Sequence, residues 1–164
     1  SEQKAITYHI YGFGDPLSEE KISFAIKRYG LQDTVVFHGK IPHKDLHLIL
    51  SKHNVGVSYV PITPYFDVQP PTKTFEYLLA GMPVIATRTK ENEKVINEYN
   101  GVLIDDTPED FRNGLALLYE RISANKFTSS RIIESSESYT WERIVRNNFK
   151  LYIESLLSNH LFEK

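Results

Sequence analysis

One short apolar run constrains the fold of this chain more than any other feature. Residues 84–86 are Val-Ile-Ala, and Pro83 opens the run shortly after Gly81, which ends the helical pattern before it. A strand that is short and continuously apolar is typical of a parallel sheet whose two faces are both covered by helices. The run therefore predicts a parallel sheet between two layers of helices.

Strand and helix patterns alternate along most of the chain. The strand patterns fall at residues 6–11, 35–37, 55–60, 83–86 and 102–104. The helical patterns lie at residues 22–29, 43–53, 72–80, 93–99 and 108–122. Alternation at this spacing, together with the right-handed crossover rule, predicts a Rossmann-like α/β fold.

The longest loop of this fold leads into a helix that carries a lysine and a glutamate. Ligands of open parallel sheets bind where the strands end, and the loop at residues 61–71 follows a predicted strand. Two prolines close the loop, so the helix is expected to begin at Thr72, whose side chain can cap it. Lys73 then lies in the first turn and Glu76 in the second.

This helix start is predicted to bind a nucleotide-type ligand. The amides of Thr72, Lys73 and Thr74 and the positive end of the helix dipole would face an anionic group. The carboxylate of Glu76 can accept hydrogen bonds from both vicinal hydroxyls of a ribose. A salt bridge between Lys73 and Glu76, one turn apart, is the simpler interpretation and stays open.

The composition argues against several other classes of protein. A chain of 164 residues with 41% hydrophobic residues is sufficient for one domain with a core. The net charge of -2, with both signs interspersed, disfavours nucleic acid as the main partner. The chain has no cysteine, no signal-peptide pattern and no apolar run near the roughly 20 residues of a membrane span. We therefore expect a cytoplasmic protein that contacts a membrane only through its parent protein.

Two further motifs are weak. Gly12 and Gly14 follow the first strand pattern, but a dinucleotide fingerprint needs a third glycine where this chain has Leu17. A tight strand-to-helix turn is the simpler interpretation of these glycines. His43 and His47 have helical spacing, but the sequence offers no third ligand for a metal, so we expect no metal site.

The chain resembles a known family of sugar transferases. Residues 71–87, Pro-Thr-Lys-Thr-Phe-Glu-Tyr-Leu-Leu-Ala-Gly-Met-Pro-Val-Ile-Ala-Thr, are similar to the signature of GT-B glycosyltransferases of the family 4 type. The flanking segments keep the order of that family: the strand into Gly12-Phe-Gly14, residues 31–39, 54–57 and 101–105, and Tyr139-Thr-Trp141-Glu. The resemblance covers residues 6–157.

The resemblance implies one half of a GT-B fold. It implies the carboxyl-terminal, donor-binding half of a retaining transferase, which moves a sugar from a nucleotide-sugar to an acceptor in polysaccharide or glycan biosynthesis without a metal or other cofactor. Residues 1–127 would form the donor-binding domain, with its first strand and helix preceding residue 1, and residues 128–164 would form helices that pack on it. The acceptor domain would lie amino-terminal to this piece, which alone would be inactive.

The same resemblance implies roles for individual residues, although it nominates no catalytic one. Glu76 would bind the ribose hydroxyls, Thr72 and Lys73 would face the diphosphate or the sugar, and the loop at residues 38–41 would lie beside the base. The site residues that we predict are Glu76, Lys73, Thr72, Thr74, Gly39, His38, Gly12 and Gly14.

One position departs from the pattern of the family. Many members carry a glutamate that contacts the sugar eight residues before the one matching Glu76, and this chain has Val68 there. Subgroups with the Pro-Thr-Lys-x-x-Glu-Tyr form commonly lack this glutamate, so Tyr65, Phe66 and Asp67 are candidates for the sugar side. A non-catalytic scaffold that keeps the fold is the alternative function. A nucleotide-sugar epimerase would need acid and base residues that the sequence does not offer.

The last predicted helices carry an apolar stripe, which we expect to pack on the sheet domain. A partner-binding face is the alternative for this stripe. Its residues are Trp141, Val145, Phe149, Tyr152 and Leu156.

Overall fold

The computed structural model of the protein describes residues 6–160. The chain divides into two compact units, Ser1–Ile49 and Leu50–Lys164. The ends of the predicted ranges, residues 1–5 and 161–164, lie outside the described residues. The division that we predict after residue 127 stays a prediction.

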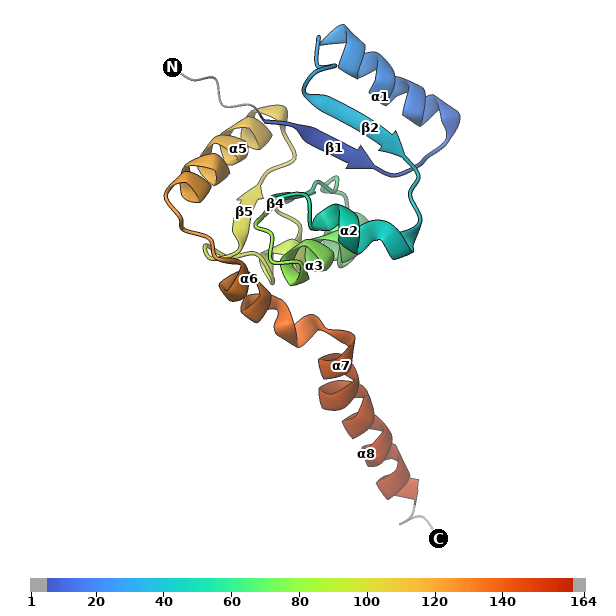
Figure 1. The fold of residues 1–164 in the computed structure, drawn as a ribbon. Coiled ribbons are helices and arrows are strands. Elements are labelled where there is room, and N and C mark those ends of the chain that lie inside the picture. The colour runs from blue at the N-terminus through green and yellow to red at the C-terminus, as the bar shows by residue number, and fades with distance from the viewer. Residues whose placement is uncertain (1–5, 161–164) are drawn as a thin grey trace. The chain divides into compact units, whose positions relative to one another are not determined.

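The first unit is built around a pair of parallel strands. Strand β1 (Tyr8–Tyr11) pairs with β2 (Val35–Gly39), and the helix α1 (Pro16–Arg28) connects them. Figure 1 shows α1 lying alongside the two strands. A 3-10 turn at His43–Asp45 and the short helix α2 (Leu46–Leu50) follow along the chain. The predicted strand, tight turn and helix after residue 6 are therefore all present.

The second unit contains a sheet of three parallel strands. Its strands are β3 (Gly56–Ser58), β4 (Val84–Thr87) and β5 (Gly101–Ile104), and β4 lies in the middle. Each pair is parallel, with Val57 beside Ile85 and Ile85 beside Val102. The predicted strands at these positions are confirmed.

Three longer helices flank this sheet. Helix α3 (Thr72–Leu79) connects β3 to β4 and packs against α6 (Ser129–Ser136), while α5 (Pro108–Ser123) runs beside β5, as Figure 1 shows. The predicted Rossmann-like arrangement of parallel strands with flanking helices is confirmed.

The central strand is buried on both faces, as its apolar sequence predicts. Val84 and Ala86 pack with Leu78 of α3 and Ile132 of α6, and all four side chains are buried. The side chain of Ile85 points to the other face, because successive side chains of a strand alternate. The cluster on that face contains Ile85, Val102, Ile104 and Leu118.

Two glycines determine how α3 meets the sheet. A Cβ atom at Gly56 would lie 2.3 Å from the ring of Tyr77, so the helix can lie this close to β3 only because the strand has no side chain there. Gly81 follows the end of α3 with φ of +76°, a backbone conformation that glycine adopts without strain. Gly81 therefore ends the helix as predicted.

The short helix after β4 differs from its prediction. The sequence predicts a helix over residues 93–99, but α4 spans Lys90–Glu93. Thr89 caps this helix, because its side chain accepts a hydrogen bond of 3.2 Å from the amide of Asn92. The side chain of Asn100 then closes the turn before β5. Local capping hydrogen bonds therefore placed the helix earlier than the apolar pattern indicated.

Helix α5 begins as the sequence predicts. Pro108 is its first residue, and the side chain of Thr107 accepts a hydrogen bond of 3.1 Å from the amide of Asp110. Both features are strong signals for a helix start, which is why this boundary is predictable from the sequence alone.

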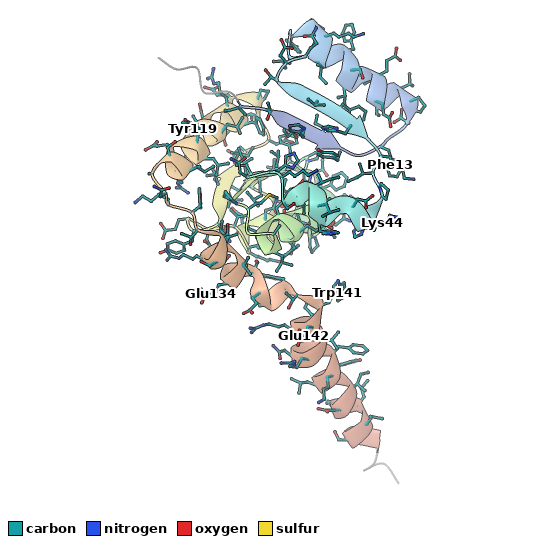
Figure 2. The ribbon with its side chains drawn as sticks, viewed as in Figure 1. Phe13, Lys44, Tyr119, Glu134, Trp141 and Glu142 are labelled. Atoms are coloured by element: carbon teal, nitrogen blue, oxygen red, sulfur yellow. The ribbon has the colours of Figure 1, made fainter. Side chains whose placement is uncertain are left out.

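The last helices leave the predicted apolar stripe uncovered. A short helix α7 (Trp141–Ile144) and a single π turn lead into α8 (Lys150–His160). Trp141 is 81% exposed and projects from α7 in Figure 2, and Leu156 is 40% exposed. The packing that we predict for residues 128–164 on the sheet domain stays a prediction. No helix among residues 6–160 is both long and apolar enough to cross a membrane.

Candidate functional site

The carboxyl edge of the three-stranded sheet carries most of the polar side chains that bond to one another in the second unit. Because the strands are parallel, Tyr59 after β3, Arg88 after β4 and Asp105 after β5 leave the sheet at the same edge. The loop of residues 59–71 begins at this edge and ends at the first residue of α3. The start of α3 is therefore the natural place for a ligand of this sheet.

The start of α3 has no side-chain cap. Its N-cap residue is Pro71, whose extended backbone (φ -80°, ψ 111°) precedes Thr72 as the first helical residue. The prediction that Thr72 caps the helix is therefore wrong, because a cap must stand one position earlier. No acidic side chain lies in the first turn, and the amides of Thr72 and Lys73 precede the first hydrogen bond of the helix.

Thr74 has a structural role that differs from the predicted one. Its amide donates a hydrogen bond of 3.0 Å to the carbonyl of Pro71, so it is not the open donor that we predict. Its hydroxyl is fully buried and donates to Oδ1 of Asn92 at 2.9 Å. Since that hydroxyl has one proton, Ser58 must donate the bond of 2.6 Å that joins the two hydroxyls.

Asn92 extends this network to the central strand. Its Nδ2 atom donates a hydrogen bond of 2.9 Å to the carbonyl of Thr87, at the end of β4. Ser58, Thr74, Thr87 and Asn92 are all 0% exposed, so these bonds are shielded from water. The buried network holds the inner side of α3 against β3 and β4.

Lys73 lies beside the end of β3. Its Nζ atom donates a hydrogen bond of 2.6 Å to the carbonyl of Tyr59. The side chain is half-buried, and this burial lowers the pKa of Lys73 below its ordinary value because desolvation disfavours the charged form. The lysine therefore connects the first turn of α3 to the loop after β3.

Glu76 shares one side of α3 with the open amides. It stands four residues after Thr72 and three after Lys73, a spacing that places the three residues together on a helix. Thr74 and Leu78 bury the opposite side of α3. Glu76 is half-buried in the second turn. This arrangement can hold an anionic group at the amides and a pair of hydroxyls at the carboxylate.

The glycine loop of the first unit, Gly12 to Gly14, provides fewer open amide donors for a phosphate than the start of α3. The amide of Gly12 donates a hydrogen bond of 2.9 Å to the carbonyl of Gly39. The amide of Gly14 donates to Oε1 of Glu19 at 3.1 Å. Both amides thus donate hydrogen bonds within the chain. An anion could accept hydrogen bonds from them only after these bonds were broken.

His38 belongs to a group of stacked rings in the first unit. Its Nε2 atom lies 2.8 Å from Nδ1 of His9, and its ring stacks on Tyr11 with centroids 4.3 Å apart. The predicted site residues thus form two groups, one in each unit. The first unit holds Gly12, Gly14, His38 and Gly39, and the second holds Thr72, Lys73, Thr74 and Glu76.

The sequence did not predict the contacts that shape the loop at 59–71. Asp106 accepts hydrogen bonds from within this loop, and the carboxylate of Asp67 accepts one of 2.9 Å from the amide at the start of α4. A usable signal existed for Ser58 and Thr87, because each is a polar residue that ends an apolar strand. Within residues 6–160, no three histidine or acidic side chains are grouped as metal ligands.

Fold and site together define a parallel α/β domain with an open helix start at the carboxyl edge of its sheet. The sequence pattern of the glycosyl transferases of group 1 matches residues 1–121. The chain belongs to this family. A search of curated proteins found no match.

Solved structures of glycosyltransferases are similar to this chain over nearly its whole length. Sucrose-phosphate synthase from Thermosynechococcus elongatus is 27% identical, with a TM-score of 0.67 over 92% of this chain and 38% of its own. The Anabaena protein HepE, in complex with UDP and glucose, is 18% identical, with a TM-score of 0.68 over 93% and 40%. A glycosyltransferase from Rickettsia africae is 14% identical, with a TM-score of 0.73 over 94% and 41%. The chain thus spans about 40% of the length of these proteins.

Proposed function

We propose that this chain is the donor-binding half of a glycosyltransferase, which moves a sugar from a nucleotide-sugar to an acceptor in polysaccharide or glycan biosynthesis. The observation that carries the proposal is the start of α3, which has no side-chain cap and no acid in its first turn, beside Glu76. Membership of the group 1 glycosyl transferases supports the reaction class. The acceptor would bind in an amino-terminal half of the parent protein, in the cytoplasm.

The binding mode follows from the two kinds of group on this side of α3. The amides of Thr72 and Lys73 and the helix dipole hold the diphosphate, and Glu76 accepts hydrogen bonds from the ribose hydroxyls. Thr74 does not contact the ligand but keeps the helix start in place. The roles that the family resemblance implies for His38 and Gly39 beside the base, and for Gly12 and Gly14, stay predictions.

The chemistry follows from the charge that develops during transfer. The bond between the anomeric carbon and the diphosphate oxygen breaks, the acceptor hydroxyl forms a new bond to that carbon, and the proton of the hydroxyl passes to the leaving diphosphate. Negative charge grows on the leaving diphosphate, where oriented amides contribute several kcal/mol in preorganised sites. No metal and no nucleophile from this chain takes part, and the configuration at the anomeric carbon is retained.

Thermal unfolding of the full-length protein with UDP, GDP and ADP tests the proposal. UDP belongs in the panel because HepE is described in complex with it. One of the three is expected to raise the midpoint, because a ligand at about 100 times its Kd stabilises the folded state by about 2.7 kcal/mol. If none of them stabilises the protein, the non-catalytic scaffold becomes the better function.

A variant of Glu76 locates the effect. Glu76→Ala is expected to weaken the nucleotide by about tenfold or more, because it removes charge-assisted hydrogen bonds to the ribose. Glu109→Ala is the matched control, since Glu109 is an exposed glutamate on α5. Calorimetry that finds equal affinity in the two variants would place the nucleotide elsewhere.

A further inference from the structure

Tyr59 is held at both of its ends. Its carbonyl accepts the hydrogen bond of 2.6 Å from Nζ of Lys73, and its hydroxyl donates to Oδ1 of Asp106. Its ring also meets that of Phe111 in α5 edge to face, with centroids 6.2 Å apart. We refer to these contacts of Lys73, Asp106 and Phe111 as the Tyr59 clamp. The clamp joins the first turn of α3 to the segment after β5 through one residue.

The clamp fixes the beginning of the loop of residues 59–71. The hydroxyl of Thr87 accepts a bond of 2.9 Å from the amide of Val60 and donates one of 2.7 Å to the carbonyl of the same residue. The second carboxylate oxygen of Asp106 accepts the amide of Ile62 at 3.1 Å. The loop therefore leaves the sheet along a path that side chains from two neighbouring strand ends determine.

A second anchor fixes the far part of the same loop. Asp67 accepts hydrogen bonds from the backbone amide and from Nζ of Lys90, at 2.9 Å and 3.0 Å. Between the two anchors, Tyr65 is 70% exposed and Phe66 is 39% exposed. These exposed apolar side chains thus lie on a loop whose backbone is hydrogen-bonded to the rest of the unit before and after them. We refer to this anchored loop as the frame.

The ammonium group of Lys73 is directed into this frame. It donates to a backbone carbonyl, and burial lowers the pKa of this lysine. Partial desolvation of an ammonium group carries a cost. The carbonyl of Tyr59 offsets the cost, because it accepts a charge-assisted hydrogen bond. The observed partner of the lysine is therefore the loop.

We propose that Lys73 is a positioning residue, which acts on the bound donor through Tyr59 and the loop of residues 59–71 rather than through a contact with phosphate. This inference rests on the proposed function and refines it. The diphosphate is held by the amides at the start of α3, and the lysine side chain sets the distance between that start and the loop. Asp106 performs the same task from the side of β5.

Hydrogen exchange of the full-length protein without ligand tests the clamp itself. In Lys73→Met, the amides of Val60 and Ile62 are expected to exchange about ten times faster or more, because local opening of the loop loses a hydrogen bond to a charged group. Lys94→Met is the matched control, since Lys94 is an exposed lysine directly after α4 whose Nζ atom pairs with Glu91. Unchanged exchange in Lys73→Met overturns the proposal, whatever the protein binds.

A second variant probes the other end of the clamp. Tyr59→Phe removes the hydroxyl that reaches Asp106 but changes no group that is proposed to touch the nucleotide. It is expected to accelerate the same amides. The double variant Lys73→Met with Tyr59→Phe should show less than the product of the two single effects, because both act on one residue. Independent effects, which multiply in the double variant, contradict a shared clamp.

The ligand test uses UDP, UMP and uridine with Lys73→Met. A positioning role predicts that the affinities for all three fall by the same factor, within about twofold, and that the loss does not depend on salt. A direct phosphate contact predicts a loss for UDP about tenfold larger than for uridine, which shrinks in salt. The second pattern overturns the proposal. If GDP or ADP is the nucleotide that stabilises the wild-type protein, its own monophosphate and nucleoside replace UMP and uridine. Absence of binding of UDP, GDP and ADP alike counts against the proposed function, while the exchange experiment still decides on the clamp.

Discussion

Helices α1 and α3 both follow a parallel strand, but their first turns are completed in opposite ways. The start of α1 is completed by its own side chains: Asp15 accepts the amide of Ser18 at 3.1 Å, and Glu19 accepts the amide of Gly14. The start of α3 has a proline as its N-cap and neither a cap side chain nor an acid. A glycine-rich turn is the familiar signal for phosphate, yet here the proline-closed turn has the open amides.

The difference shows how a protein can stabilise a helix start and still leave it open to a ligand. The stabilising bonds of α1 lie at the front of the helix, where carboxylates would repel an anion. Those of α3 lie behind it, in the buried hydroxyl and amide groups of Thr74 and Asn92. A network at the back leaves the amides at the front free of acids.

Removal of the network behind α3 is expected to give the largest effect. Asn92→Ala removes the acceptor of the buried Thr74 hydroxyl, at about 1–3 kcal/mol. It also removes one of the two donors to the carbonyl of Thr87, which keeps the amide of Thr89 at 2.8 Å, at about 1 kcal/mol. We therefore expect the free energy of unfolding in urea to fall by about 2–4 kcal/mol. Asn113→Ala, on the exposed side of α5, is the control and should change little. A loss below 1 kcal/mol would mean that the network does not hold the helix.

An acid placed at the front of α3 makes this helix resemble α1. Thr72→Asp is expected to weaken UDP by about tenfold, since the new carboxylate stands where the diphosphate should bind. Stability should be unchanged or higher, because an acid in the first turn contributes about 0.3–1 kcal/mol. Thr72→Asn has nearly the same shape without the charge and should keep most of the affinity. If calorimetry finds that both variants lose the same affinity for UDP, the effect is due to the shape of the side chain and not to its charge.

Loss of the cap of α1 should cost less than loss of the network behind α3. Asp15→Ala removes the acceptor of the Ser18 amide and hydroxyl, at 3.1 Å and 2.6 Å. The expected cost is about 1 kcal/mol, as for other N-cap residues. The urea midpoint should fall while the slope stays constant, and Ser23→Ala in the same exposed helix is the control. A cost larger than that of Asn92→Ala would reverse the comparison.

The smallest effect is the pH dependence of that cap. Hydrogen bonds from the hydroxyl and amide of Ser18 lower the pKa of Asp15 below 3.8. A carboxylate whose pKa is lower in the folded state stabilises that state fully at any pH above its unfolded pKa. This contribution is lost as the pH falls through the folded pKa. The stability difference between the wild-type protein and Asp15→Asn should therefore shrink below pH 3.8. A difference that stays constant with pH would show that the charge of Asp15 is irrelevant to the cap.

The parts of the site that could be predicted are those that a local pattern encodes. Gly81 ends α3 and Thr107 begins α5 because each acts on its own backbone neighbours. The two prolines before Thr72 likewise placed Lys73 and Glu76 in successive turns of one helix. By contrast, α4 was misplaced because the apolar spacing after residue 93 outweighed the cap at Thr89 in the interpretation of the sequence.

The partners of polar side chains could not be predicted in the same way. Asp106 reaches Tyr59 across 47 residues of sequence, and Asn92 reaches Thr74 across 18. Such pairs form because parallel strands bring their carboxyl ends together, and no local pattern indicates which donor will meet which acceptor. The exposed stripe from Trp141 to Leu156 illustrates the same limit, since amphipathic spacing identifies an apolar face but not what covers it.

The sequence by itself determined that this protein has a parallel, doubly covered sheet and a helix start that follows two prolines, because alternation, glycine and proline act over a few residues. Only the tertiary structure decided which helix start is open. The carboxylate of Glu19 accepts the hydrogen bond of the Gly14 amide at the start of α1. The first turn of α3 is instead held by hydrogen bonds between buried side chains on the opposite side of the helix. The tertiary structure likewise directed Lys73 to the carbonyl of Tyr59, because the fold brings the residue after β3 within 2.6 Å of its Nζ atom.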